Sequence, residues 1–149
     1  MKSLFNTQHN QEIINRINSL TPESKAEWGK MNVSQMFVHN QVGLKGAFGE
    51  MKFKRGLIAL LFGKMAKKIL TNDKHFKRNL PTDKAFIITE QKNFEEEQQK
   101  LIQLVKRFSQ DGPKGITREP HPFFGKLTTE EWDILQWKHM DHHLRQFGA

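Results

Sequence analysis

The chain has 149 residues, of which 36% are hydrophobic and 27% are charged, and its formal net charge is +8. This length predicts a single domain, residues 1–149, with one hydrophobic core. The chain contains no cysteine, which excludes disulfides, thiolate zinc sites and a cysteine nucleophile and is in keeping with a cytoplasmic location.

Two helices are predicted in the first third of the chain. Isoleucines recur at helical spacing between Thr7 and Leu20, and Pro22 disfavours helix in the residue before it, which ends this helix. Asn32 is a candidate N-cap for a second helix that extends to about Phe48. The residues that precede the first helix lack the apolar core of a signal peptide.

The middle of the chain is predicted to be a long crossover. Residues 56–70 read as a short extra helix that begins apolar and ends basic, and we expect it to form a lid or a crossover segment. Its apolar run at 57–62 is too short to cross a bilayer, so no membrane span is expected. Residues 71–92 read as a connection in which 85–89 are extended.

Two further helices follow. Asn93 with Glu96, and Thr128 with Glu131, form the capping-box pattern that marks a helix start. The first of these helices ends at Asp111-Gly112-Pro113, and the second covers residues 129–147. Four long helices with one long crossover predict an all-α fold, a four-helix bundle of up-down-down-up topology.

The last helix carries the first chemical signal, because His139 and His143 lie four residues apart in it. Residues at this spacing are neighbours on one helix face. Apolar Trp132 and Leu135 fall on the same quarter of the circumference. We therefore expect both imidazoles to face the interior of the bundle.

The second predicted helix supplies a third histidine, His39, on the face that also carries Met36. Gly43 lies one turn further and is expected to leave space beside the His39 ring. Three imidazoles around one divalent ion, with a fourth position open, are typical of catalytic sites and not of closed structural ones. The sequence therefore predicts an open three-histidine metal site.

Each histidine also has a simpler interpretation. A single histidine on an apolar face is commonly a hydrogen-bonded core residue. His142 forms a competing i, i+3 pair with His139, although it lies off the apolar stripe. His9 and His75 lie among polar residues and are expected at the surface, and Asp141 lies opposite the stripe.

These residues carry a resemblance to a known superfamily. The segments MFVHN (36–40) and HMDHHLRQ (139–146) resemble the DinB/YfiT-like superfamily of four-helix metalloproteins. The C-terminal run HPFFGKLTTEEWDILQWKHMDHHLRQFG, preceded by LPTD and NFEEEQQKL, is similar to one uncharacterised branch of it, and this narrower likeness extends over nearly the whole chain. The superfamily implies a DinB-like bundle with a three-histidine divalent metal site. Some relatives transfer low-molecular-weight thiols such as bacillithiol, mycothiol or glutathione, and others are assigned as hydrolases.

Three residues are candidates for supporting roles. His121, in the HPFFG loop before the last helix, is the candidate catalytic acid or base, with a substrate contact or a fourth ligand as alternatives. The simpler interpretation is a loop anchored by Phe123 and Phe124 in which His121 caps a backbone group. Asn40 and Gln146 lie beside the ligands in sequence, where hydrogen bonds from them would orient the imidazoles.

Two functions remain open from the sequence. A divalent ion provides a nucleophile at neutral pH from water or from a small-molecule thiol, which predicts a metal-dependent thiol transferase or hydrolase. The alternative is a metal-binding or stress-related module without turnover. Zinc and nickel are the ions expected first, with iron and manganese as alternatives, because imidazole suits several divalent metals. The expected partner is a small molecule, and a homodimer is left open.

The positive charge is concentrated in the middle of the chain, where residues 25–92 carry 14 Lys/Arg against 5 Asp/Glu. Such a segment attracts nucleic acid, anionic lipid or acidic substrates. No nucleic-acid-binding motif accompanies it, so we interpret it as a solvated basic face without a specific nucleic-acid partner.

If this interpretation is right, the protein binds nucleic acid weakly and without sequence preference. Affinity should fall steeply between 50 and 200 mM salt, roughly 10³-fold or more if six phosphates are contacted, because only counterion release drives such binding. Fluorescence anisotropy with labelled duplexes measures this dependence. Tight, sequence-selective binding at physiological salt would contradict it.

Overall fold

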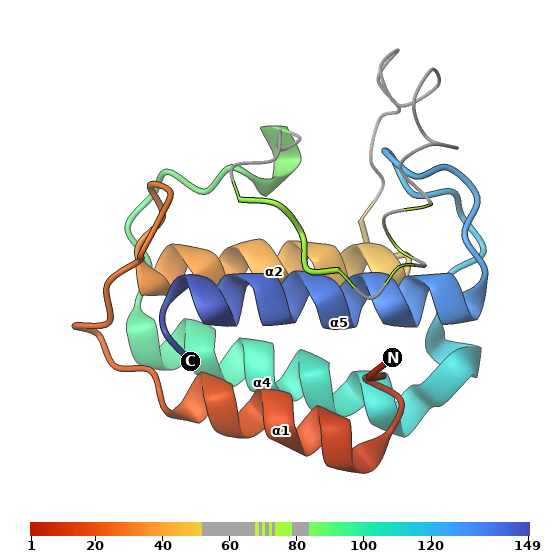
Figure 1. The fold of residues 1–149 in the computed structure, drawn as a ribbon, viewed down its shortest axis with the longest axis horizontal. Helices are drawn as coiled ribbons and strands as arrows, with labels where there is room; N and C mark the ends of the chain where they lie inside the picture. Colours follow the sequence, from red (N-terminus) through yellow and green to blue (C-terminus); the bar gives the residue numbers. More distant parts are fainter. Residues whose placement is uncertain (52–67, 69, 71, 73, 79–83) are drawn as a thin grey trace.

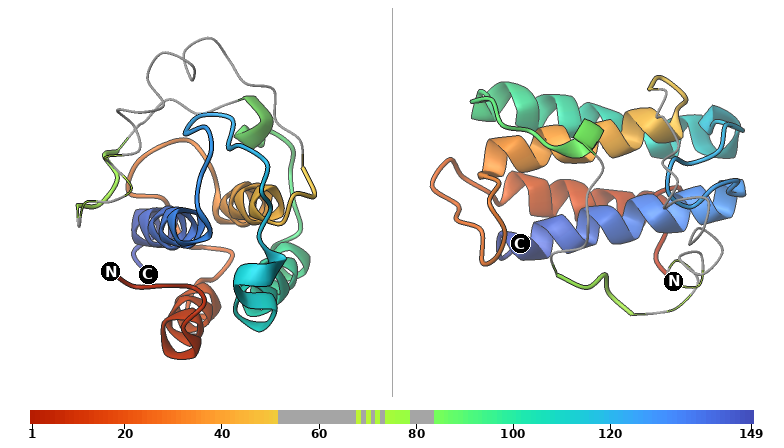
Figure 2. Two further views of the ribbon diagram at one scale, coloured as in Figure 1. Left: turned by 90° about the vertical axis from the view of Figure 1, so that its right-hand side faces the viewer. Right: turned by 90° about the horizontal axis from the view of Figure 1, so that it is seen from above.

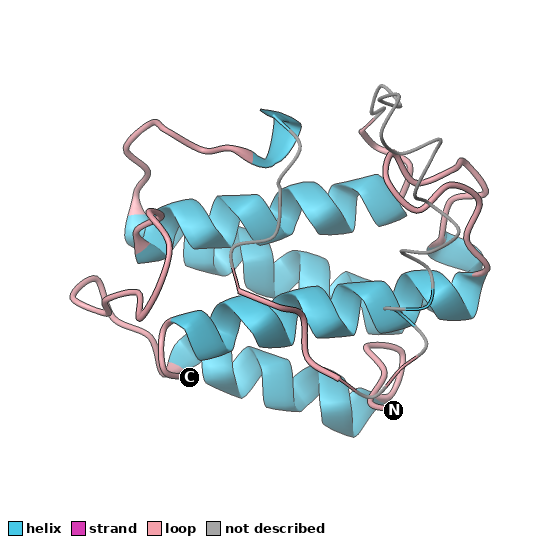
Figure 3. Ribbon diagram, turned by 45° about the horizontal axis from the view of Figure 1, so that its top comes forward, coloured by secondary structure: helices cyan, strands magenta, loops and turns pink. Residues whose placement is uncertain are grey.

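The structure is a computed structural model, and it describes residues 1–51, 68, 70, 72, 74–78 and 84–149. This part of the chain is all-helical and contains no strand (Figures 1 and 3). Its α-helices are α1 (Thr7–Asn18), α2 (Val33–Ala47), α4 (Phe94–Asp111) and α5 (Thr129–Gln146), and its 3₁₀ helices are η1 (Lys84–Phe86) and η2 (Gly112–Gly115). None of the helices within the described ranges is both long and apolar enough to cross a membrane.

The predicted helix starts are confirmed. Asn32 caps α2 in a reciprocal capping box with Gln35, and Thr128 caps α5 in the same way with Glu131. Asn93 caps α4 by accepting a hydrogen bond from the Glu96 backbone N–H. These side chains satisfy N–H groups that have no acceptor inside the helix.

The prediction for the crossover is wrong at Lys84–Phe86, and its predicted helix over 56–70 lies largely outside the described residues. Lys84–Phe86 form a single 3₁₀ turn and not an extended segment, because the Ile87 N–H donates to the Lys84 carbonyl at 3.1 Å. The β-branched residues that suggested an extended chain begin only after this turn. The helix predicted over 56–70 lies outside the described residues except for Lys68, in helical conformation, and Leu70, which is also helical and fully buried.

The four α-helices share one core. Helices α1 and α2 each pack against both α4 and α5, and the end-on view shows the four lying alongside one another (Figure 2). Fully buried side chains from all four helices fill the space between them. They include Ile13, Ile17, Met36, Phe37, Leu44, Leu101, Val105, Phe108, Met140 and Leu144.

The segment before α1 is fastened to this core by buried polar contacts. The Leu4 N–H donates to Asp133 Oδ1 at 2.7 Å. The Asn10 side chain donates to the Leu4 carbonyl at 2.9 Å and to the Val105 carbonyl at 2.7 Å. Burial raises the pKa of Asp133 against the opposing effect of its hydrogen bonds. The chain start is thereby tied to α4 and α5.

A buried carboxylate joins α2 to α4. Glu97 is 8% exposed, and its carboxylate accepts hydrogen bonds from Gln41 Nε2 at 2.8 Å and from Lys100 Nζ at 3.1 Å. Burial raises the pKa of Glu97, but these donors and the charges of Lys100 and Lys92 outweigh it, so its pKa is lowered from the usual value of 4.5.

We expect Glu97→Gln to lower the free energy of unfolding by about 1–2 kcal/mol at pH 7, since it removes charge-assisted hydrogen bonds. The folded pKa is below the unfolded one, so this stability is present above pH 4.5 and is lost as pH falls through the folded pKa. Urea denaturation at pH 7 and pH 3 should show a larger difference between variant and wild type at pH 7 than at pH 3. Glu96→Gln, which removes an exposed partner of Lys100, is the matched control and should change stability by less than about 0.5 kcal/mol.

Candidate metal centre

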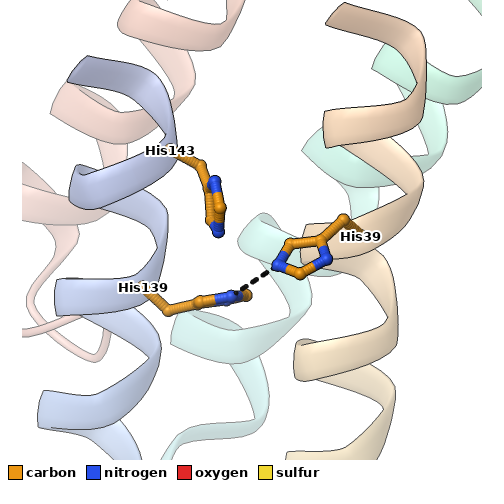
Figure 4. A group of neighbouring side chains, drawn as sticks. All are labelled: His39, His139 and His143. Carbon is orange, nitrogen blue, oxygen red and sulfur yellow. Dashed lines mark hydrogen bonds between the residues drawn. The ribbon is translucent and has the colours of Figure 1, made fainter. Parts of the chain in front are cut away.

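Three histidines from two helices meet at the interface of α2 and α5. Helix α2 supplies His39, and α5 supplies His139 and His143 from successive turns (Figure 4). One ring nitrogen from each lies within 4.8 Å of the other two. His39 and His143 are buried and His139 is partly exposed. The structure thus brings together the three residues that the sequence nominated as ligands.

The tautomer of His39 is fixed by a backbone carbonyl. Its Nδ1 lies 2.8 Å from the Phe86 oxygen, in the 3₁₀ turn η1. A carbonyl oxygen only accepts hydrogen bonds, so Nδ1 carries the proton. The neutral ring therefore presents the lone pair of Nε2 to the other two histidines.

The tautomer of His143 is fixed in the same way by a side chain. Gln146 Nε2 donates to the Trp28 carbonyl, which orients the amide so that its Oε1 faces His143. His143 Nδ1 lies 2.8 Å from that oxygen and donates to it. The Nε2 lone pair of His143 consequently faces the same point as that of His39.

The loop glycine Gly29 makes room for this amide. Its φ of +82° favours glycine, and a Cβ there would lie only 2.6 Å from Gln146 Nε2. A side chain at position 29 would therefore displace the group that orients His143.

The third histidine closes the cluster. His139 Nε2 lies 2.9 Å from His39 Nε2. The space that Gly43 leaves lies beside His139, since a Cβ at position 43 would lie 3.3 Å from His139 Nδ1. The ring–ring centroid distances within the cluster are 4.4–4.9 Å.

Burial keeps all three rings neutral. It is the largest cause of a lowered pKa in each, and neighbouring histidines add to it. The pKa of His143 falls to about 3, that of His139 lies well below its usual value of 6.5, and that of His39 is lowered. Neutral imidazole is the form that binds metal ions. Lone pairs that face one point repel each other unless a proton or a cation lies between them.

The donor set fits a nitrogen-ligated divalent ion. Ligands at 2.0–2.1 Å in tetrahedral geometry place their nitrogen atoms about 3.3 Å apart. The observed spacing, from 2.9 Å for one pair to at most 4.8 Å for any pair, brackets this value. Small shifts of the side chains would therefore be sufficient to hold an ion.

The comparisons with known proteins give a family and no more. Residues 2–149 match the family model described as "Protein of unknown function (DUF1569)". The chain belongs to this family. Searches of curated proteins and of solved structures found no match. Family membership agrees with the expected relation to an uncharacterised group of proteins and carries no activity with it.

The remaining histidines of this DUF1569 chain lie outside the cluster of three. His142 packs edge-on against Trp28 at 5.7 Å and against Phe76 at 6.2 Å. His75 is exposed, as expected, with Nδ1 3.1 Å from Asp141 Oδ2. Asp141 also accepts a hydrogen bond from Arg16, which accords with its predicted place away from the ligands.

His9 is partly exposed, and it also has a packing role that the sequence did not indicate. Its ring meets Trp137 edge-on at a centroid distance of 5.7 Å. Its Nδ1 accepts the Ser3 backbone N–H at 3.2 Å. The polar neighbours in the sequence concealed this role, which depends on the tertiary contact between α1 and α5.

His121 lies in the loop before α5 and is buried. Its Nδ1 accepts the backbone N–H groups of Phe123 and Phe124 at 3.1 and 3.2 Å, so it caps the loop. Its ring packs on Phe124 and on Trp132, at 4.9 and 5.2 Å. Phe123 is 42% exposed and does not anchor the loop as expected.

The two expected supporting residues have different surroundings. Gln146 contacts the ligand His143, as described above. Asn40 is buried and donates from Nδ2 to the Met36 carbonyl at 3.0 Å, while its Oδ1 has no hydrogen-bond partner among the described residues. No hydrogen bond from Asn40 to a ligand histidine is found within the described part of the chain.

Sequence reasoning missed the group that fixes His39. The Phe86 carbonyl belongs to the backbone, and no residue type marks it. It also missed Gln136 of α5, whose side-chain oxygen lies, with His139 Nδ1, beside Gly43. Its position three residues before His139 was a usable signal, because residues at this spacing share a helix face.

In the metal-free protein, we expect the free energy of unfolding to fall as pH falls below 6.5. The folded pKa values lie below the unfolded one, so the unfolded chain binds more protons in this range. For His143 the window extends from about 6.5 to about 3, with a slope of up to about 1.4 kcal/mol per pH unit for each histidine.

Urea denaturation at pH 7, 6 and 5 measures this slope. His143→Leu should reduce the slope by the contribution of one histidine, up to about 1.4 kcal/mol per pH unit. An unchanged slope in the variant would contradict the assignment of a depressed pKa to His143. Ring NMR shifts of His139 and His143 should accordingly stay constant from pH 8 to pH 6.

Proposed function

We propose that this protein is a divalent-metal-dependent enzyme that acts on a small molecule and holds its ion with His39, His139 and His143. The observation that carries the proposal is the convergence of three neutral imidazoles, two of which have their Nδ1 protons committed to carbonyl oxygens. Zinc and nickel are the first candidates, with iron and manganese as alternatives.

The reaction class follows from the ligand set. A divalent ion held by three imidazoles supplies a Lewis acid that lowers the pKa of water or of a thiol to near neutrality. The chain has no cysteine, so a reacting thiol belongs to a low-molecular-weight substrate. Thiol transfer and hydrolysis are the two reactions that such a centre supports.

His121 is the proposed catalytic residue outside the ligand set. Its Nδ1 is occupied by two backbone N–H groups, so in the neutral ring Nε2 carries the exchangeable proton. Its ring packs on Trp132, and it lies outside the group of three histidines whose ring nitrogens converge. This position favours an acid, base or substrate-contact role over a fourth ligand.

For the fold, we propose a single DinB-like domain with up-down-down-up topology. The support is that α1 and α2 each pack against both α4 and α5. We further propose a small-molecule partner and no specific nucleic acid, and a homodimer is a further candidate.

A second candidate is a metal-binding or stress-related module without turnover. Two surface concavities, of about 690 and 250 Å³, lie along α1 and beside α5 near the N-terminus, and neither is lined by a ligand histidine. Metal analysis of freshly purified protein, followed by metal-supported turnover of a panel of thiols and esters, discriminates the two. Binding without turnover across the panel would favour the module.

The central prediction compares two neighbouring histidines. His143→Ala should abolish stoichiometric zinc binding and any metal-dependent turnover while the helices persist, because the apolar core lies elsewhere. His142→Ala should retain affinity within about threefold, since its ring packs on Trp28 and Phe76. Isothermal titration and circular dichroism measure both. Equal loss in the two variants would mean that the ligand face is misassigned, and no loss in either would remove the metal site.

A further inference from the structure

Gln136, on α5, has a buried carbonyl oxygen that the proposed function leaves unexplained. The residue is 2% exposed, and its Oε1 accepts no hydrogen bond from any described residue. Buried polar atoms are rarely left without a partner, because the lost hydrogen bond to water is not replaced. We therefore expect Gln136 Oε1 to accept a hydrogen bond in another state of the neighbouring site.

The location of this oxygen identifies the donor. A Cβ at Gly43 would lie 3.1 Å from Gln136 Oε1 and 3.3 Å from His139 Nδ1. The oxygen and the ring nitrogen thus line the same space against the α2 backbone, which glycine keeps open. Gln136 also lies three residues before His139, on the same face of α5.

Gln136 Oε1 and His139 Nδ1 form no hydrogen bond in this state, and the tautomer of His139 agrees with that. His39 has its proton on Nδ1, so the 2.9 Å contact between the two Nε2 atoms requires His139 to donate from Nε2. The neutral His139 ring then has a lone pair on Nδ1, and a lone pair cannot donate to Gln136.

We propose that Gln136 is a positioning residue of the metal centre, whose Oε1 accepts the Nδ1–H of His139 once an ion is held. The inference rests on the proposed function. Binding through Nε2 requires that nitrogen to give up its proton to solvent, and the neutral ring takes up one proton at Nδ1, so no net proton is released. Each ligand then has a carbonyl acceptor, namely the Phe86 oxygen, Gln146 Oε1 and Gln136 Oε1.

The test replaces Gln136 with a side chain of similar length that has no acceptor. Gln136→Met should weaken zinc binding 10–100-fold, the usual effect of removing a partner of a metal ligand. Without zinc, its melting temperature should equal or exceed that of the wild type, since no orphaned oxygen remains. Gln41→Met is the matched control: Gln41 is a buried glutamine of α2 bound to Glu97, and its loss should lower stability and leave zinc affinity unchanged.

Ring ¹⁵N NMR of the wild-type protein provides a second readout that needs no variant. His139 should carry its proton on Nε2 without zinc and on Nδ1 with zinc. An unchanged zinc affinity in Gln136→Met, or a zinc-loaded His139 that lacks the Nδ1 proton, would overturn the inference while the metal centre stands. A wild-type protein that binds no zinc or other divalent ion would overturn the proposed function, and the inference with it.

Discussion

The whole arrangement depends on neutral imidazoles held inside the interface between α2 and α5. Burying a charge there would cost far more than burying a neutral ring, and burial accordingly lowers the pKa of each histidine. A neutral imidazole has one donor and one acceptor nitrogen, so whatever occupies the donor determines where the acceptor is directed. The carbonyl oxygens of Phe86 and Gln146 occupy two of the donors. Their placement directs the Nε2 lone pairs of His39 and His143 toward the same space as the ring of His139.

One of those oxygens comes from a distant part of the chain and the other from α5 itself. The 3₁₀ turn η1 presents the Phe86 carbonyl, and the loop before α2 holds Gln146, the last residue of α5, through the Trp28 carbonyl. The apolar core is shared by the four helices, while η1 and the loop before α2 supply the contacts that orient the rings. This division agrees with the general pattern in which scaffolds position ligands and loops tune them.

The sequence was sufficient for the four described α-helices and for the three histidines that the structure brings together. Capping residues such as Asn32 and Thr128 act locally, so their effect is readable from neighbouring letters, and the spacing of His139 and His143 follows from helix geometry. The sequence was not sufficient where tertiary contacts decide. The hydrogen bond from His39 to the Phe86 carbonyl, the packing of His9 on Trp137 and the place of Gly43 beside His139 each depend on residues far away in the chain.

The glycine at position 29 has a consequence for how mutational data on this family should be read. It lies outside the cluster of three and more than a hundred residues before Gln146, yet it leaves no space for a methyl group beside that amide. A saturation scan scored by function would therefore mark Gly29 as intolerant, as it would a ligand. Two causes would act together: backbone strain at a positive φ, and steric exclusion transmitted through one amide to one ring. Intolerance at this loop glycine would then report on backbone conformation and on the orientation of His143, and not on contact with any bound molecule.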